Sequence, residues 1–128
     1  MPHIDGHDRS YMQARLREEI ARCRRFGGKF TLLMVEEMPS TDGLTIRRKL
    51  IEGLRVLQRI TRSCDVVAHI FDDTIAVLLV ETDSAHAKAA LLRIQNYLAR
   101  WAGVWAVSSY SFPEQEADIV GLSLLQAA

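Results

Sequence analysis

The chain has 128 residues, of which 48% are hydrophobic and 25% charged, so it has the length of one domain and enough apolar material to bury a core of its own. The 16 basic and 16 acidic residues give a formal net charge of zero, which excludes a global field that would collect nucleic acid or anionic lipid. The longest wholly apolar run, Ile75 to Val80, is far shorter than the roughly 20 residues of a membrane-spanning helix, and the chain does not open with a signal-peptide pattern. We therefore expect a cytoplasmic protein with one domain over residues 1–128.

The first half of the sequence predicts two helices around a buried strand. Residues 10–25 carry apolar side chains at helical spacing opposite a basic face, and the glycine pair at 27–28 ends this helix. Residues 30–35 form a continuous apolar run, which is typical of a strand buried on both faces. A second amphipathic helix is expected from about Thr45 to Ile60.

The second half predicts a hairpin, a helix, a strand and the start of another helix. Two apolar runs between residues 62 and 80 flank a short acidic turn, as in a β-hairpin. Asp83 or Ser84 is a suitable N-cap for a third helix, and Gly103 ends it. Its expected core-facing residues are Ala87, Leu91, Ile94, Leu98 and Trp101. Residues 104–109 follow as the last strand, and 119–127 is expected to begin a further helix.

This order of elements predicts an α+β fold, a ferredoxin-like palm of β-α-β-β-α-β order with an additional N-terminal helix. Right-handed crossovers in such a fold bring the end of the first strand beside the hairpin turn. Carboxylates at these two places would then be positioned to share a cation. Cys23 and Cys64 lack the spacing of a metal site and lie in apolar-patterned segments, so we expect buried, reduced thiols and no cofactor.

The hairpin and its turn, Phe71-Asp72-Asp73-Thr74-Ile75, carry a resemblance to a known family. They resemble the central hairpin of GGDEF domains, the bacterial diguanylate cyclases, whose turn reads Gly-Gly-Asp/Glu-Glu-Phe. Residues 33–36 are similar to the family's first strand, which ends in a metal-binding Asp, and Asp8-Arg9 stands where the family has Asn-Arg. Ser108 begins what resembles the Ser-Ile-Gly segment. The resemblance covers nearly the whole chain and implies a nucleotidyl-cyclase-like palm.

The same resemblance implies that catalysis has been lost. In active members the first-strand Asp and the first acid of the turn hold magnesium, and Glu36 and Asp73 match these two positions. The next position is a catalytic Glu in the family but is Thr74 here, and a hydroxyl does not supply the missing charge. Phe71 and Asp72 replace both glycines, where nucleotide would approach. We therefore expect no catalytic residues and only vestigial metal candidates, although acids are also ordinary residues in hairpin turns.

A second family site is better preserved. GGDEF enzymes often bind their product, cyclic di-GMP, at an inhibitory Arg-x-x-Asp motif before the turn, with a further arginine from the following helix. Arg62, Asp65 and Arg93 match these positions, and guanidinium groups suit both phosphate and the acceptor edge of guanine. The competing interpretation is a surface ion pair between Arg62 and Asp65, worth about 0–1 kcal/mol.

These observations favour a catalytically inactive GGDEF-like regulatory domain of bacterial cyclic di-GMP signalling, binding cyclic di-GMP at the retained motif. Because that ligand packs between domains in this family, we expect a protein partner or self-association, and neither nucleic-acid binding nor membrane insertion. One alternative is a ligand-free protein-interaction or dimerisation module. Another is a palm-type nucleotide-binding enzyme that uses Glu36 and Asp73 for metal. The chain also fits a fragment of a larger signalling protein.

Overall fold

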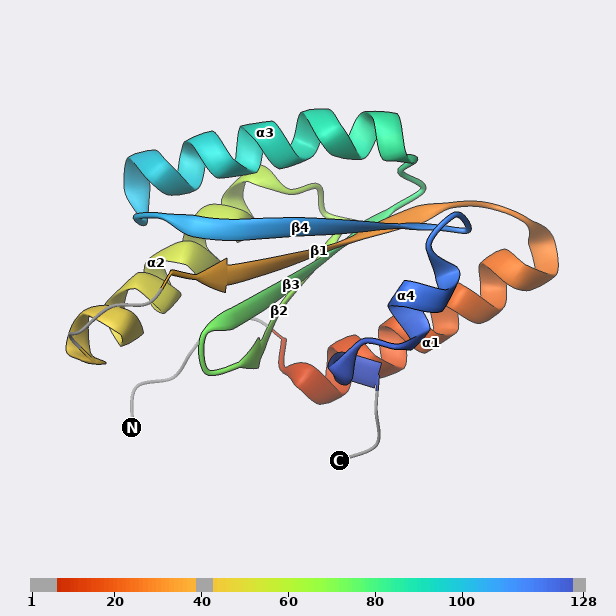
Figure 1. Ribbon diagram of the computed structural model, residues 1–128, viewed down its shortest axis with the longest axis horizontal. Helices are drawn as coiled ribbons and strands as arrows, with labels where there is room; N and C mark the ends of the chain where they lie inside the picture. Colours follow the sequence, from red (N-terminus) through yellow and green to blue (C-terminus); the bar gives the residue numbers. More distant parts are fainter. Residues whose placement is uncertain (1–6, 39–42, 126–128) are drawn as a thin grey trace.

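Four strands and four α-helices make up the part of the chain that the computed structural model describes, residues 7–38 and 43–125, with the side chains of 43–48 excepted (Figure 1). In chain order they are α1 (Arg9–Phe26), β1 (Phe30–Glu37), α2 (Gly43–Ile60), β2 (Val66–Phe71), β3 (Thr74–Val80), α3 (Ser84–Trp101), β4 (Trp105–Phe112) and α4 (Glu116–Val120), followed by the 3₁₀ turn η1 (Ser123–Leu125). No helix within these residues combines the length and hydropathy needed to cross a bilayer.

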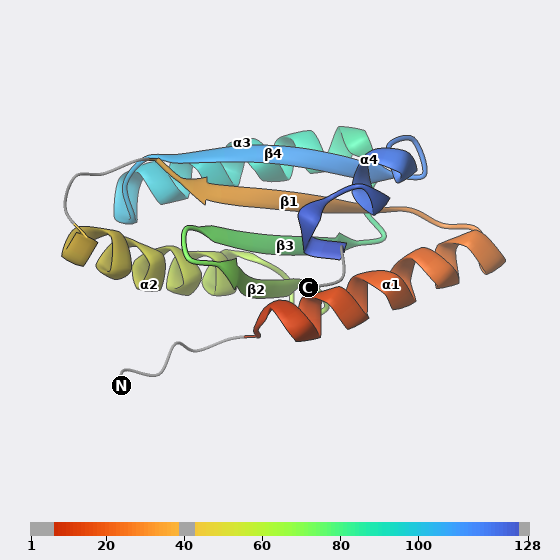
Figure 2. The ribbon, with the colours of Figure 1, turned by 60° about the horizontal axis from the view of Figure 1, so that its bottom comes forward.

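The strands form one antiparallel sheet in the order β2-β3-β1-β4. Helices α2 and α3 cover one face, while α1 and α4 lie against the other (Figures 1 and 2). This arrangement confirms the predicted α+β palm. At the β2 edge, the backbone of His7 forms a bridge to Ala68, and the His69 N–H donates to the His7 carbonyl at 2.9 Å.

The core is divided by the sheet into two apolar layers. Along β1, Leu32 and Met34 pack toward α1, whereas Leu33 and Val35 pack toward α2 and α3. A strand that is buried on both faces requires a continuous apolar run rather than an alternating one, which is why residues 30–35 could be recognised as a strand from the sequence.

Side-chain caps fix the start of two helices. The Asp8 carboxylate accepts from the Tyr11 N–H at 3.0 Å at the start of α1, and the Asp83 carboxylate accepts from the His86 N–H at 2.8 Å at the start of α3. Each cap satisfies a backbone donor that has no partner inside its helix. The prediction of an N-cap at Asp83 or Ser84 is thus confirmed for Asp83.

The structure corrects the prediction for the end of the chain. Residues 119–127 do not begin a long helix over their described part, because α4 stops at Val120, Gly121 follows, and only the 3₁₀ turn η1 comes after it. The apolar residues that indicated a helix serve the core instead, since Ile119 and Leu124 are fully buried in the layer beneath α1.

Two side chains are also more exposed than expected. Trp101, the last residue of α3, is 62% exposed, whereas Leu98 and Ala102 are buried, so Trp101 lies beside the core-facing stripe and not on it. Cys64 is exposed in the turn between α2 and β2, whereas Cys23 is buried as predicted.

Candidate functional site

The end of β1 lies beside the hairpin turn, as the sequence predicts. Glu36 is paired with Thr74 in the register of β1 and β3, and the Glu37 N–H donates to the Asp73 carbonyl at 2.8 Å. The two vestigial metal candidates are therefore near the same end of the sheet, Glu36 on β1 and Asp73 in the hairpin turn beside it. Within residues 7–38 and 43–125, no group of three or more His, Cys, Asp or Glu side chains is arranged to hold a metal ion.

The turn itself consists of Asp72 and Asp73, between the last residue of β2 and the first residue of β3. Thr74 is buried, and its hydroxyl donates to the Asp73 carboxylate at 2.9 Å. Phe71 has the Arg9 guanidinium 5.0 Å from its ring centroid. The turn is thus occupied by an aromatic ring and a carboxylate that already has a hydroxyl donor.

Glu37 is a notable residue that the sequence analysis missed. It is buried, and neither carboxylate oxygen has a hydrogen-bond partner. Burial raises the pKa of Glu37, Lys49 opposes this effect, and the Asp73 carboxylate adds to it. The signal was present in the alternation of β1, because Leu33, Val35 and Glu37 share one face of the strand.

Arg62 and Asp65 form a compact ion pair in the turn between α2 and β2. Arg62 Nε donates to Asp65 Oδ2 at 3.1 Å, and Nη2 donates to Oδ1 at 2.9 Å. The backbone N–H of Arg62 also donates to Oδ2, at 2.9 Å. Two further acceptors hold Nη2: the Val80 carbonyl at 2.8 Å and the Thr82 hydroxyl at 3.0 Å. The guanidinium therefore ties this turn to the end of β3.

The two members of the pair differ in exposure. The Arg62 side chain is 54% exposed, but that of Asp65 is only 2% exposed. The hydrogen bonds that Arg62 donates to Asp65, together with the charge of Asp65, raise the pKa of Arg62 against the opposing effect of desolvation. Asp65 is thus placed to hold Arg62, while Arg62 faces solvent next to a surface depression of about 210 Å³ that His7 and Gln58 also line.

Arg93 is on a different element from this pair. It is exposed on α3, one helical turn before Tyr97 and on the same side of the helix. Among the described residues, no hydrogen bond or ion pair joins Arg93 to Arg62 or Asp65. The structure thus shows a direct contact between Arg62 and Asp65, and the joint use of these residues with Arg93 stays a prediction.

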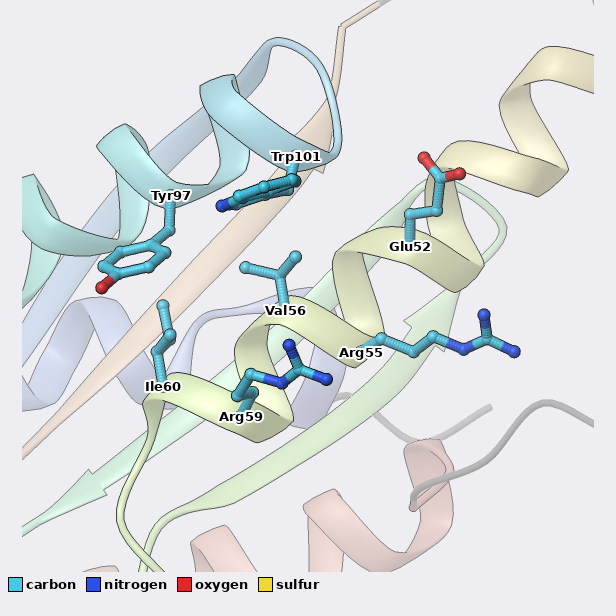
Figure 3. Close-up of a pocket in the computed structure, with 7 residues that line it drawn as sticks. All are labelled: Glu52, Arg55, Val56, Arg59, Ile60, Tyr97 and Trp101. Carbon is cyan, nitrogen blue, oxygen red and sulfur yellow. The ribbon is translucent and has the colours of Figure 1, made fainter.

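A second hollow lies between α2 and α3, with a volume of about 420 Å³. Figure 3 shows Val56 and Ile60 of α2 facing Tyr97 and Trp101 of α3. Glu52, Arg55 and Arg59 complete the lining. We call this hollow the α2/α3 groove. Trp101 was predicted to face the core, so the groove was not expected, although Tyr97 and Trp101 have the i,i+4 spacing of one exposed stripe.

Comparison with known proteins bears on the fold. No family model matches the chain, and no curated protein matches it. Among solved structures, a DGC protein from Thermotoga maritima is 19% identical with a TM-score of 0.79, over 97% of this chain and 98% of that one. The GGDEF domain of DgcB from Caulobacter crescentus, in complex with c-di-GMP, is 14% identical with a TM-score of 0.64, over 81% and 68%.

The chain has the fold of a GGDEF domain. The diguanylate cyclase SiaD from Pseudomonas aeruginosa, in complex with its activator SiaC, is also similar: 20% identity and a TM-score of 0.72, over 94% of this chain and 53% of SiaD. The structural similarity is thus to GGDEF domains of c-di-GMP signalling proteins. At these identities the likeness concerns the fold.

Proposed function

We propose that this chain is a non-catalytic GGDEF-like regulatory domain that binds cyclic di-GMP through Arg62, with Arg93 as a second contact. The main observation in support of the proposal is that the Arg62 guanidinium is both fixed in position and exposed to solvent. Its guanidinium is held in one place by Asp65, Val80 and Thr82, yet its side chain is 54% exposed. A cation that is both positioned and exposed is suited to an anionic ligand.

The chemistry left to Arg62 fits phosphate or guanine. Nε and Nη2 are engaged, whereas no described residue accepts from Nη1. Nη1 has two N–H donors, so it can donate to a phosphate oxygen or to the O6 and N7 acceptors of guanine. Because both Asp65 oxygens already accept from Arg62, we assign Asp65 the role of a positioning residue.

The state of the hairpin turn supports a non-catalytic role. Phosphoryl transfer with a bound metal needs carboxylates free to coordinate it. Here Asp73 accepts from the Thr74 hydroxyl, and Thr74 is itself buried. Phe71 and Asp72 add bulk and negative charge where a nucleotide triphosphate would approach.

Binding of cyclic di-GMP would act by population shift. A ligand favours whichever arrangement of domains or partners it binds more tightly. Cyclic di-GMP carries two guanines and two phosphates, so it can be held from two sides at once. The regulatory role then lies in the assembly that the ligand stabilises, which is consistent with a protein partner or self-association.

Calorimetric titration of the purified chain with cyclic di-GMP tests this proposal. We expect saturable binding that Arg62→Ala abolishes and Arg93→Ala weakens. Lys88→Ala is the matched control, because Lys88 is another exposed cation on α3, and it should leave binding unchanged. Absence of heat with cyclic di-GMP at high micromolar concentration would refute the receptor and favour a ligand-free interaction module.

A parallel titration with GTP and magnesium separates the remaining alternative. Binding of GTP that requires magnesium and is lost in Glu36→Ala would favour a palm-type nucleotide-binding enzyme using Glu36 and Asp73. We expect no such binding, and no product in an assay for cyclic di-GMP synthesis.

A further inference from the structure

The α2/α3 groove has the shape of a docking site for a helix. Its floor is apolar, formed by Val56 and Ile60 on one side and by Tyr97 and Trp101 on the other (Figure 3). Along α2 the lining runs from Glu52 to Ile60, which is eight rises of 1.5 Å, or about 12 Å. This is two turns of helix, enough for an i, i+3, i+4, i+7 set of anchoring side chains.

The aromatic side chains of the groove are unusually exposed. Tyr97 is 42% and Trp101 62% exposed. The guanidinium of the neighbouring Arg100 lies over the Trp101 ring, 5.7 Å from its centroid, and the ring still keeps a large area in contact with water. Tyr, Trp and Arg are the residues enriched at the centres of protein interfaces, and this groove presents all three.

The charges around the groove indicate the kind of partner. Arg55 and Arg59 are exposed, and neither has a hydrogen-bond or ion-pair partner within residues 7–38 and 43–125. Arg100 adds a third positive charge, whereas Glu52 is the acid of the lining. A second copy of the chain would bring the same excess of arginines against itself, while an acidic partner would be attracted.

We infer that the α2/α3 groove binds an acidic amphipathic helix of a partner protein. The partner's apolar stripe covers Val56, Tyr97 and Trp101, and its flanking carboxylates face Arg55 and Arg59. This inference does not rest on nucleotide binding, because none of the groove residues belongs to the Arg62 site.

Two synthetic 18-residue peptides of opposite charge test the inference. Both have Leu at i, i+3, i+4 and i+7 and Ala at the outer positions; the flanking positions are Glu in one and Lys in the other. We expect the acidic peptide to bind saturably with a blue shift of Trp101 fluorescence, more weakly as salt is raised. The basic peptide should not bind.

Variants of the groove locate the binding. Trp101→Ala should weaken binding of the acidic peptide at least tenfold, and Arg55→Glu/Arg59→Glu should reverse the preference so that the basic peptide binds instead. These are exposed positions, so circular dichroism should show an unchanged fold. Lys88→Glu makes the same reversal of charge on another part of α3 and should leave binding unchanged.

Three results would overturn the inference. They are no saturable binding of the acidic peptide up to millimolar concentration, equal binding of both peptides, and binding that the groove variants do not alter. Sedimentation of the free protein tests the competing occupant: a dimer that Trp101→Ala dissociates would assign the groove to a second copy. The groove variants should bind cyclic di-GMP with the same affinity as the unsubstituted chain. A failure of the groove inference can then be distinguished from a failure of the proposed cyclic di-GMP site.

Discussion

A single methyl group added at Gly53 should disturb the packing of α2 on the sheet. A Cβ atom at this position would lie 2.8 Å from Cζ2 and 3.1 Å from Cη2 of the Trp105 ring, and 3.4 Å from Cδ1 of Ile75. Trp105 is buried, and its indole N–H donates to the Ala102 carbonyl at 2.9 Å. Because the ring is buried and its N–H is hydrogen-bonded, it has little room to move away.

Two opposing terms set the size of the effect. Replacing glycine by alanine inside a helix stabilises it by about 1 kcal/mol, whereas overpacking a tight core costs about 1–3 kcal/mol. We expect Gly53→Ala to lower the free energy of unfolding by about 1 kcal/mol, measured by urea denaturation. Without the contact with Trp105, the same substitution would be stabilising.

The double variant Gly53→Ala/Trp105→Phe supplies the control. A phenyl ring lacks the outer part of the indole that the new methyl group meets, so the cost of Gly53→Ala should fall or change sign in that background. An unfolding free energy that rises in Gly53→Ala alone, or no coupling between the two substitutions, would refute the packing argument.

Three further substitutions test other parts of the structure. Leu57→Ala empties a fully buried position and should destabilise by about 2–5 kcal/mol in the same urea assay; a loss below 1 kcal/mol would contradict the described core. Glu37→Gln should stabilise the protein above pH 4.5, the ordinary pKa of the group, because burial raises the pKa of Glu37 in the folded state. Thermal melts should show that this gain vanishes below pH 4.5, where Glu37 is protonated in both the folded and the unfolded state. The backbone N–H of His86 holds the pKa of Asp83 down to about 2, against an ordinary 3.8. The contribution of the Asp83 carboxylate to stability should therefore be complete above pH 4 and be lost as the pH falls toward 2. The melting temperatures of Asp83→Ala and the unsubstituted chain should converge over this interval.

Much of the fold could be predicted because its signals are local. The continuous apolar run of β1, the two apolar runs around Asp72 and Asp73, and the cap at Asp83 each depend on neighbours in the sequence. The position of Glu36 beside the hairpin turn could be predicted from the topology, because crossovers of fixed hand allow few arrangements of the strands in a sheet. The position of Arg62 beside Asp65 followed from a three-residue spacing.

The features that escaped prediction depend on contacts distant in sequence. Trp101 is three residues after Leu98 and was therefore expected in the core, but the buried stripe continues from Leu98 to Ala102 instead, so helical spacing alone misplaced Trp101. Residues 119–125 are apolar because they cover α1, and apolar content does not distinguish a helix from a 3₁₀ turn. The Arg62 side chain donates four hydrogen bonds, and two of them go to Val80 and Thr82, which are 18 and 20 residues further along the chain. A local motif could not predict these two.

The bridge between His7 and Ala68 has a consequence for the behaviour of the chain in solution. An uncovered edge strand is a template on which other chains can add, and proteins protect such edges with short covering segments. His7 provides this protection at β2, and the next residue, Asp8, caps α1. A truncation that removes both residues would therefore expose the strand and fray the helix together, so we expect aggregation to begin at this edge.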